Sequence, residues 1–311
     1  MAFDTILVVS VLAVAVWTIV ARDTLGAAVG FIAFGLLVAL MWVRLAAPDV
    51  ALTEAALGSG LTGGLLLAAS TRLGRAGTTV ARETPGAILR YAAVVVCALV
   101  TAGLVALLPL LPEPAPTLAT QAAANIAATG LLNPVTAVLM AYRAIDTLLE
   151  VVVLLLALFG MWSLAPDRLW GGLPRRSGLP DPDGLLTFVA QLLVPVGILV
   201  GIHIFWIGSV TPGGEFQGAT ILAAMWILAA VAGLVDAPAA SRRWLRLLLI
   251  AGPAVFLAIG LAGFAIAGSF LAYPASYAKL LILAIEIPVT LSIAAMLALL
   301  VAGPPKRETQ R

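Results

Sequence analysis

Charged residues within long apolar stretches are the first candidates for chemistry in this sequence. Arg143, Asp146, Thr147 and Glu150 share one such stretch, at spacings that place them on one face of a helix. We expect an ion pair between Arg143 and Asp146, with Glu150 about one turn deeper. A charge near the bilayer centre costs about 2.5–3.5 kcal/mol, so it needs a partner, water or a function. A carboxyl group there can pass a proton or hold a cation; alternatively, the cluster only docks the helix onto a partner subunit.

Two other apolar stretches contain acids of the same kind. Lys279 and Glu286 are seven residues apart and therefore share a helix face, and Pro288 loosens the helix just after the acid. Glu54 lies one and a half turns beyond Asp49, at the start of a further stretch. We interpret Asp49 as a helix-capping residue and Glu54 as the better ion-pathway candidate. For each of these acids the alternative to a role in ion transport is a purely structural role in helix packing.

A turn-rich connection separates two apolar stretches near residue 210. Its characteristic residues are Pro212, Gly213, Gly214, Glu215 and Gly218. So many turn-permissive residues around one acid predict a tight external or partly re-entrant loop that needs unusual backbone angles. His203, near the end of the preceding stretch, is interpreted as a polar interface residue, with a proton relay as the alternative.

The elements that carry these residues are predicted to be transmembrane helices. Of the 311 residues, 62% are hydrophobic and 10% are charged, which excludes an ordinary soluble protein. Nine apolar stretches reach the length of about 20 residues that crosses a bilayer. They are residues 3–20, 24–45, 48–69, 91–111, 134–160, 185–207, 217–235, 247–268 and 276–302. We therefore predict an all-α, polytopic transmembrane helical bundle of about nine spans.

The distribution of basic residues orients this bundle. With nine spans, 14 of the 17 Lys and Arg residues fall in connections on one side, which the positive-inside rule makes cytoplasmic. Arg143 and Lys279 are the two basic residues left within spans. The sequence thus predicts a protein of the plasma (inner) membrane, with an external N-terminus and a cytoplasmic C-terminus.

The composition also excludes several kinds of site. One cysteine and one histidine rule out an intramolecular disulfide, a cysteine-based zinc site and a thiolate-held iron–sulfur cluster. No nucleophile with a neighbouring base and no phosphate-binding loop is recognisable in the sequence. We expect no cofactor, no metal, no enzymatic activity and no nucleic-acid partner. The lack of a recognisable internal repeat disfavours a freestanding secondary transporter, since many of these are built from repeated halves.

Three segments resemble modules of one family of ion-translocating complexes. Residues 47–55, Ala-Pro-Asp-Val-Ala-Leu-Thr-Glu-Ala, resemble the D subunit of membrane-bound hydrogenases and the equivalent C-terminal part of the A subunit of Mrp-type Na+/H+ antiporters. Residues 133–139, together with the charged residues of 143–150, resemble the E-type module that follows it. Residues 212–218, Pro-Gly-Gly-Glu-Phe-Gln-Gly, resemble the glycine-rich signature of the antiporter B subunit. The three resemblances occur in this order and cover nearly the whole chain.

The resemblance implies a fused chain with a modular organisation. The implied modules are a hydrogenase-D-like module with a following span (1–111), an E-like module with the charged span (112–165), a cytoplasmic linker (166–184) and a four-span B-subunit-like module (185–311). The B-like signature departs from its usual pattern at two positions. Ser209 stands where a histidine is common and Glu215 where a third glycine is common, which leaves the chemistry of this loop open.

The resemblance further implies a membrane subunit of a multisubunit monovalent cation (Na+)/proton antiporter or antiporter-like module. Its partners would be other antiporter-like membrane subunits, and Na+ and H+ would be the transported ions. By this resemblance Glu54, Asp146 and Glu150 line the ion pathway, and Glu286 joins them on physical grounds; the residues that pair with or tune these acids would be Arg143, Lys279 and Thr147. The alternatives are a membrane-arm subunit of a redox-driven pump with redox partners, a freestanding transporter, and a scaffold whose buried charges only dock partners.

Overall fold

The described part of the chain is built from helices that suit a membrane. The computed structural model describes residues 2–75, 86–112, 117–164, 184–235 and 242–303, and these residues form helices and no strand. Eight of the helices are long and apolar enough to cross a bilayer, or nine if one bent pair counts as a span. These findings confirm the prediction of an all-α, polytopic bundle of about nine spans.

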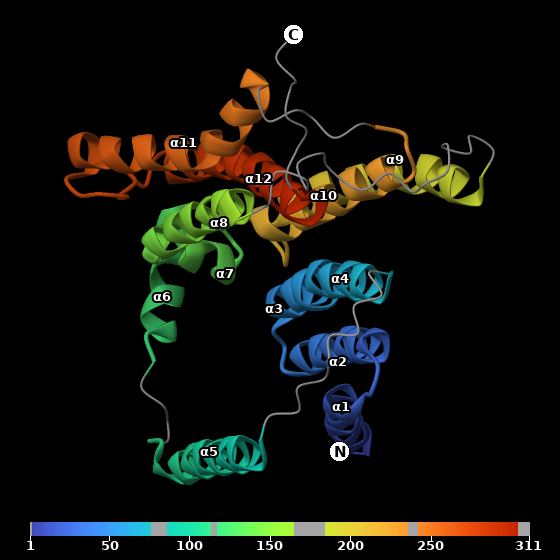
Figure 1. The fold of residues 1–311 in the computed structure, drawn as a ribbon. Helices are drawn as coiled ribbons and strands as arrows, with labels where there is room; N and C mark the ends of the chain where they lie inside the picture. The colour runs from blue at the N-terminus through green and yellow to red at the C-terminus, as the bar shows by residue number, and fades with distance from the viewer. Residues whose placement is uncertain (1, 76–85, 113–116, 165–183, 236–241, 304–311) are drawn as a thin grey trace.

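The first group of helices packs around α2 (Figure 1). Its members are α1 (Ala2–Val20), α2 (Thr24–Arg44), α3 (Pro48–Thr53), the π-helix η1 (Glu54–Thr62) and α4 (Gly63–Arg75). Asp23 caps α2, because its carboxylate accepts a 2.6 Å hydrogen bond from the N–H of Gly26. Pro48 begins α3, where its missing N–H has no helical partner to lose. The predicted spans 3–20, 24–45 and 48–69 therefore correspond closely to real elements.

Helix α5 (Ala87–Leu107), followed by the 3₁₀ turn η2 (Leu108–Leu110), stands apart from the other helices in Figure 1. It is strongly apolar, yet none of its residues is buried within the chain. A helix that is apolar all round is suited to hydrocarbon or to a neighbouring helix rather than to water.

A broken segment leads from the middle of the chain to α8. It consists of α6 (Ala119–Asn125), η3 (Ile126–Thr129), α7 (Pro134–Ala137), the π-helix η4 (Val138–Tyr142) and α8 (Ala144–Leu164). The two parts before α8, residues 119–129 and 134–142, meet at a bend of 88°. The prediction of one uninterrupted span over residues 134–160 is wrong, because Arg143 leaves the helical conformation at φ −130° and ψ 36°. The buried Thr147 hydroxyl donates a 2.8 Å hydrogen bond to the Leu139 carbonyl across this break.

The last group contains α12, the most deeply buried of the spanning helices. Its members are α9 (Leu185–Ile207), α10 (Glu215–Val231), α11 (Arg243–Ala267) and α12 (Ala278–Ala302). Helix α12 packs against α8, α10 and α11, and the hydrophobic core lies mainly along it. The predicted seventh span, 217–235, corresponds to α10, which is shorter and begins two residues earlier. Contacts of α10 with α3 and η1 join this group to the first one.

Candidate functional site

Two carboxyl groups meet in the core of the last helix group. Glu286, in the third turn of α12, is 4% exposed, and Glu215, the first residue of α10, is 6% exposed. Their side chains lie close enough to interact with each other. Two carboxyl groups in this position can share one proton, because a protonated carboxyl group donates a hydrogen bond and a carboxylate accepts it. This carboxyl pair, Glu215 and Glu286, can therefore store and exchange a proton.

Glu150 of α8 lies near this carboxyl pair, close enough for its charge to act on Glu215. Its own side chain is exposed on the surface of the chain. Because the helix is broken at Arg143, Glu150 lies in the second turn of α8, about 9 Å from its start. Acids from α8, α10 and α12 thus approach one another at one place in the bundle.

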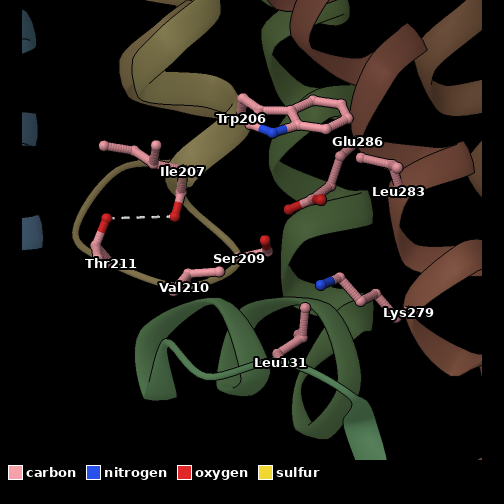
Figure 2. Close-up of a pocket in the computed structure, with 9 residues that line it drawn as sticks. All are labelled: Leu131, Trp206, Ile207, Ser209, Val210, Thr211, Lys279, Leu283 and Glu286. Atoms are coloured by element: carbon pink, nitrogen blue, oxygen red, sulfur yellow. Dashed lines mark hydrogen bonds between the residues drawn. The ribbon is translucent and has the colours of Figure 1, made fainter.

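A cavity of about 340 Å³ reaches Glu286 from the ends of α9 and α12 (Figure 2). Its lining residues are Leu131, Trp206, Ile207, Ser209, Val210, Thr211, Lys279, Leu283 and Glu286. Figure 2 shows the Lys279 amine and the Glu286 carboxylate extending from α12 toward the same space. The two residues are two helical turns apart, so the cavity extends about 10 Å along α12. The structure therefore places the predicted pair Lys279 and Glu286 along one wall.

The loop between α9 and α10, residues 208–214, forms the other side of this region. Asp49 holds it in place: the carboxylate, 6% exposed, accepts hydrogen bonds from the N–H of Gly213 at 3.0 Å and from the amide of Asn133 at 3.3 Å. The Asn133 amide also donates to the Thr211 carbonyl at 3.0 Å. We call Asp49, Asn133, Thr211 and Gly213 the Asp49 network. The structural role of Asp49 extends beyond the first turn of α3, because its carboxylate connects three distant segments.

Additional hydrogen bonds attach the loop 208–214 and α10 to their surroundings. The Ser209 carbonyl accepts from the N–H groups of Leu132 and Asn133, and the Thr136 hydroxyl donates to the Gly208 carbonyl at 2.7 Å. The side chain of Gln217 donates to the Thr53 hydroxyl at 3.1 Å. The loop is therefore fixed by hydrogen bonds to both the first helix group and the broken segment.

The glycines of this loop are required by its geometry, as the sequence predicts. Gly213 and Gly214 adopt φ values of +147° and +139°. A Cβ atom at Gly213 would lie 2.4 Å from the carbonyl oxygen of Ile204, and one at Gly208 would lie 2.4 Å from the Cα atom of Gly214. A side chain at Gly213 therefore fits neither the backbone angles nor the space, and one at Gly208 does not fit the space.

We expect Gly213→Ala to lower the stability of the folded protein by about 2 kcal/mol or more, because it adds both backbone strain and a clash. The measurement is the Tm of the purified protein in detergent. Gly103→Ala on α5 is the matched control, since open space surrounds that position and alanine favours a helix. Equal Tm values for the two variants would contradict the prediction.

Glu54 occupies a different place from the acids around Glu286. It begins η1, and its carboxylate packs against Gly58 of η1 and Gly35 of α2, where a Cβ atom would lie 3.3 Å from Oε1. The Ser59 hydroxyl, 4% exposed, adjoins the same glycine of α2. The side chain of Glu54 is thus directed at α2, and the structure does not bring it into the group formed by Glu150, Glu215 and Glu286.

Arg143 and Asp146 form the predicted ion pair, at 2.5 Å. Their side chains are 71% and 46% exposed on the chain, so the pair lies on its surface rather than in its core. Thr147 points the other way and is buried. His203 is likewise exposed on α9. Among the described residues, no group of three or more His, Cys, Asp and Glu side chains is arranged to hold a metal ion.

Two residues of the site went unrecognised as such in the sequence. From the sequence we expect Glu215 to be part of a structural loop. In the structure its side chain interacts with that of Glu286. An acid directly before an apolar helix was the available signal. Asn133 begins the segment 133–139, but nothing in that segment indicates its contacts, because its amide acts through residues that are remote in the sequence.

Comparisons with known proteins place two regions of the chain in described families. Residues 9–75 match the family model MbhD, for the D subunit of MBH, and residues 185–303 match that for a domain related to the MnhB subunit of Na+/H+ antiporter. An uncharacterized protein of Methanocaldococcus jannaschii is 31% identical over 154 residues, which are 45% of this chain and 59% of that protein. The chain therefore spans less than two thirds of the length of this relative.

Two solved structures are similar in fold. A chain of the Mrp complex from a Dietzia species has a TM-score of 0.76 and 26% identity over 100% of this chain and 36% of that one. A chain of the membrane-bound sulfane sulfur reductase, an archaeal respiratory membrane complex, has a TM-score of 0.55 and 23% identity over 69% of this chain and 99% of that one. The second likeness concerns the fold alone.

Proposed function

We propose that this chain, which is a fused subunit of the Mrp antiporter type, supplies buried carboxyl groups to the ion pathway of a multisubunit monovalent cation/proton antiporter. The observation that carries the proposal is the carboxyl pair Glu215 and Glu286, buried between α10 and α12 at the end of a cavity. Buried acids in a membrane protein are costly, and they serve most often in ion or proton transfer. The similarity to an Mrp complex chain over the whole length supports this assignment.

The proposal distributes roles among the acids. Glu286, Glu215 and Glu150 exchange protons or a cation such as Na+, with Lys279 beside them. Glu54, which lies apart from these residues against α2, contributes a separate step of the pathway. Arg143 and Asp146 dock the chain onto a neighbouring subunit, because their ion pair lies on its surface. Arg143 also tunes the pathway acids Asp146 and Glu150.

The proposal also includes the organisation and orientation of the chain. The modules are residues 1–111, 112–165 and 185–311, with a cytoplasmic linker at 166–184. The chain resides in the plasma membrane with an external N-terminus and a cytoplasmic C-terminus, and its partners are other antiporter-like membrane subunits.

The experiment that tests this function is purification of the intact complex from its own membrane, followed by reconstitution into vesicles. We expect antiporter-like subunits to co-purify and Na+ addition to dissipate an imposed pH gradient, with K+ as the comparison ion. A chain that purifies alone, and vesicles that leave the gradient intact with either ion, would contradict the proposal.

The match to the MbhD family favours a second candidate, a membrane-arm subunit of a redox-driven ion pump. The same purification separates the two. Subunits that hold iron–sulfur clusters would co-purify in that case, and ion movement would depend on an electron donor rather than on an imposed gradient.

The docking role of Arg143 leads to a further prediction. Arg143→Ala is expected to reduce both assembled complex and transport by about threefold or more, because it leaves the carboxylate of Asp146 unpaired at the proposed contact with the neighbouring subunit. The yield of complex in native gels and Na+-driven proton movement are the two measurements. Arg44→Ala is the control, because Arg44 also forms an exposed ion pair, at 2.8 Å with Asp4. Unchanged assembly together with unchanged transport would contradict the role of Arg143.

A further inference from the structure

The cavity beside α12 has four properties that bear on what enters it. One end adjoins Trp206 and Val210, which are 64% and 46% exposed, so the cavity opens at the surface of the chain. The other end reaches Glu286, which is 4% exposed. A charged amine and a carboxyl group line the same space, and such groups are stabilised by water. At about 340 Å³ the cavity has room for several water molecules.

The loop 208–214 makes this opening a fixed feature of the fold. The Ser209 carbonyl accepts hydrogen bonds from two N–H groups of the segment before α7, and the Asp49 network holds the loop on its other side. Gly130 packs directly on Lys279, since a Cβ atom there would lie 3.0 Å from the Cβ of Lys279. Hydrogen bonds therefore fix the loop 208–214 on both sides, and Gly130 packs on the Cβ atom of Lys279. The amine of Lys279 extends into the cavity (Figure 2).

We propose that this cavity is an aqueous entrance that connects the membrane surface with Glu286 and delivers protons to the carboxyl pair. Water in the cavity carries the proton from the surface, past the amine of Lys279, to Glu286. Glu286 then passes the proton to the neighbouring Glu215 of α10, next to Glu150 of α8. The proton-delivery part rests on the proposed transport function, whereas the aqueous connection does not.

The test uses single cysteines in the assembled complex. Cys97 is the only cysteine of the chain and is exposed, so it is first replaced by Cys97→Ala. Leu283→Cys places a thiol on the cavity wall, between Lys279 and Glu286. Ala284→Cys is the matched control, because the next residue of α12 lies at nearly the same depth but is exposed on the outer face of the chain. Both variants are treated with a membrane-impermeant methanethiosulfonate from each side of the membrane.

We expect Leu283→Cys to react about tenfold or more faster than Ala284→Cys, because only a hydrated thiol ionises and reacts readily. A second readout is the reaction of Glu286 with a water-soluble carbodiimide, followed by mass spectrometry. Modification of Leu283→Cys should block that reaction, and reduction of the mixed disulfide should restore it. In vesicles that transport, the same block should reduce proton movement reversibly.

The outcomes separate this inference from the proposed function. An unreactive Leu283→Cys, or a Glu286 that the carbodiimide reaches equally well after the block, would show that the cavity is not the entrance. A reactive thiol with unaltered transport would overturn proton delivery through it. If the thiol and Glu286 react as expected but the complex moves no ions, the proposed transport function is contradicted. The aqueous connection is then still supported.

Discussion

Replacement of Glu286 by glutamine is expected to reduce Na+-driven proton movement about tenfold or more while the complex still assembles. Glutamine keeps the size of the side chain and its amide can hydrogen-bond to the neighbouring Glu215, so packing along α12 is preserved. Glutamine cannot release or accept a proton, so the carboxyl pair can no longer store and exchange one. The measurement is the initial rate of proton movement per assembled complex in vesicles.

Glu286→Asp is the control for this prediction, because it shortens the side chain but retains a carboxyl group. We expect it to keep a substantial part of the rate that Glu286→Gln loses. If Glu286→Gln instead left the rate unchanged and lowered only the amount of complex, the acid would serve helix packing. That result would favour the structural alternative for the buried charges.

The second large effect is expected at Asp49. Asp49→Ala removes the acceptor for the Gly213 N–H and the Asn133 amide, and an unsatisfied buried polar group costs about 1–3 kcal/mol. With two donors affected, the loop 208–214 is released from α3, and the folded protein loses much of a typical stability margin. We expect a large fall in Tm and in the yield of assembled complex.

Asp23→Ala is the matched control for Asp49. Asp23 also accepts a hydrogen bond from a backbone N–H, that of Gly26, but it does so at an exposed helix start. Its loss is expected to cost about 1 kcal/mol at most, because water replaces the carboxylate as acceptor. A Tm for Asp49→Ala as high as that for Asp23→Ala would refute the role of the Asp49 network.

The spanning helices could be predicted because the bilayer dictates their length and composition. The apolar stretch at 185–207 became α9 with the same bounds, although Pro195 lies within it. The break at Arg143 could not be predicted in this way. No glycine or proline marks it, and the π-helix η4 together with the hydrogen bond from Thr147 to Leu139 stabilises it instead. Local sequence rules do not register a change of this kind.

The candidate site was predictable in part for a related reason. Glu286 stood out because an acid deep in an apolar helix has few explanations. Its partnership with Glu215 depends on the packing of α10 against α12, and the role of Asp49 depends on a residue 164 positions away. Such pairings arise from tertiary structure, so a single sequence contains no signal for them.

The hydrogen bond between Asp49 and Gly213 has a consequence for biosynthesis. It joins the region that matches the MbhD family to the region related to MnhB, and both lie on one polypeptide. Two separate chains would have to find each other by diffusion, at a rate set by their amounts in the membrane. Within one chain the encounter is intramolecular, with an effective concentration that the connecting residues determine. The ribosome therefore produces the two halves in equal numbers, and the contact forms only after the second half has been translated.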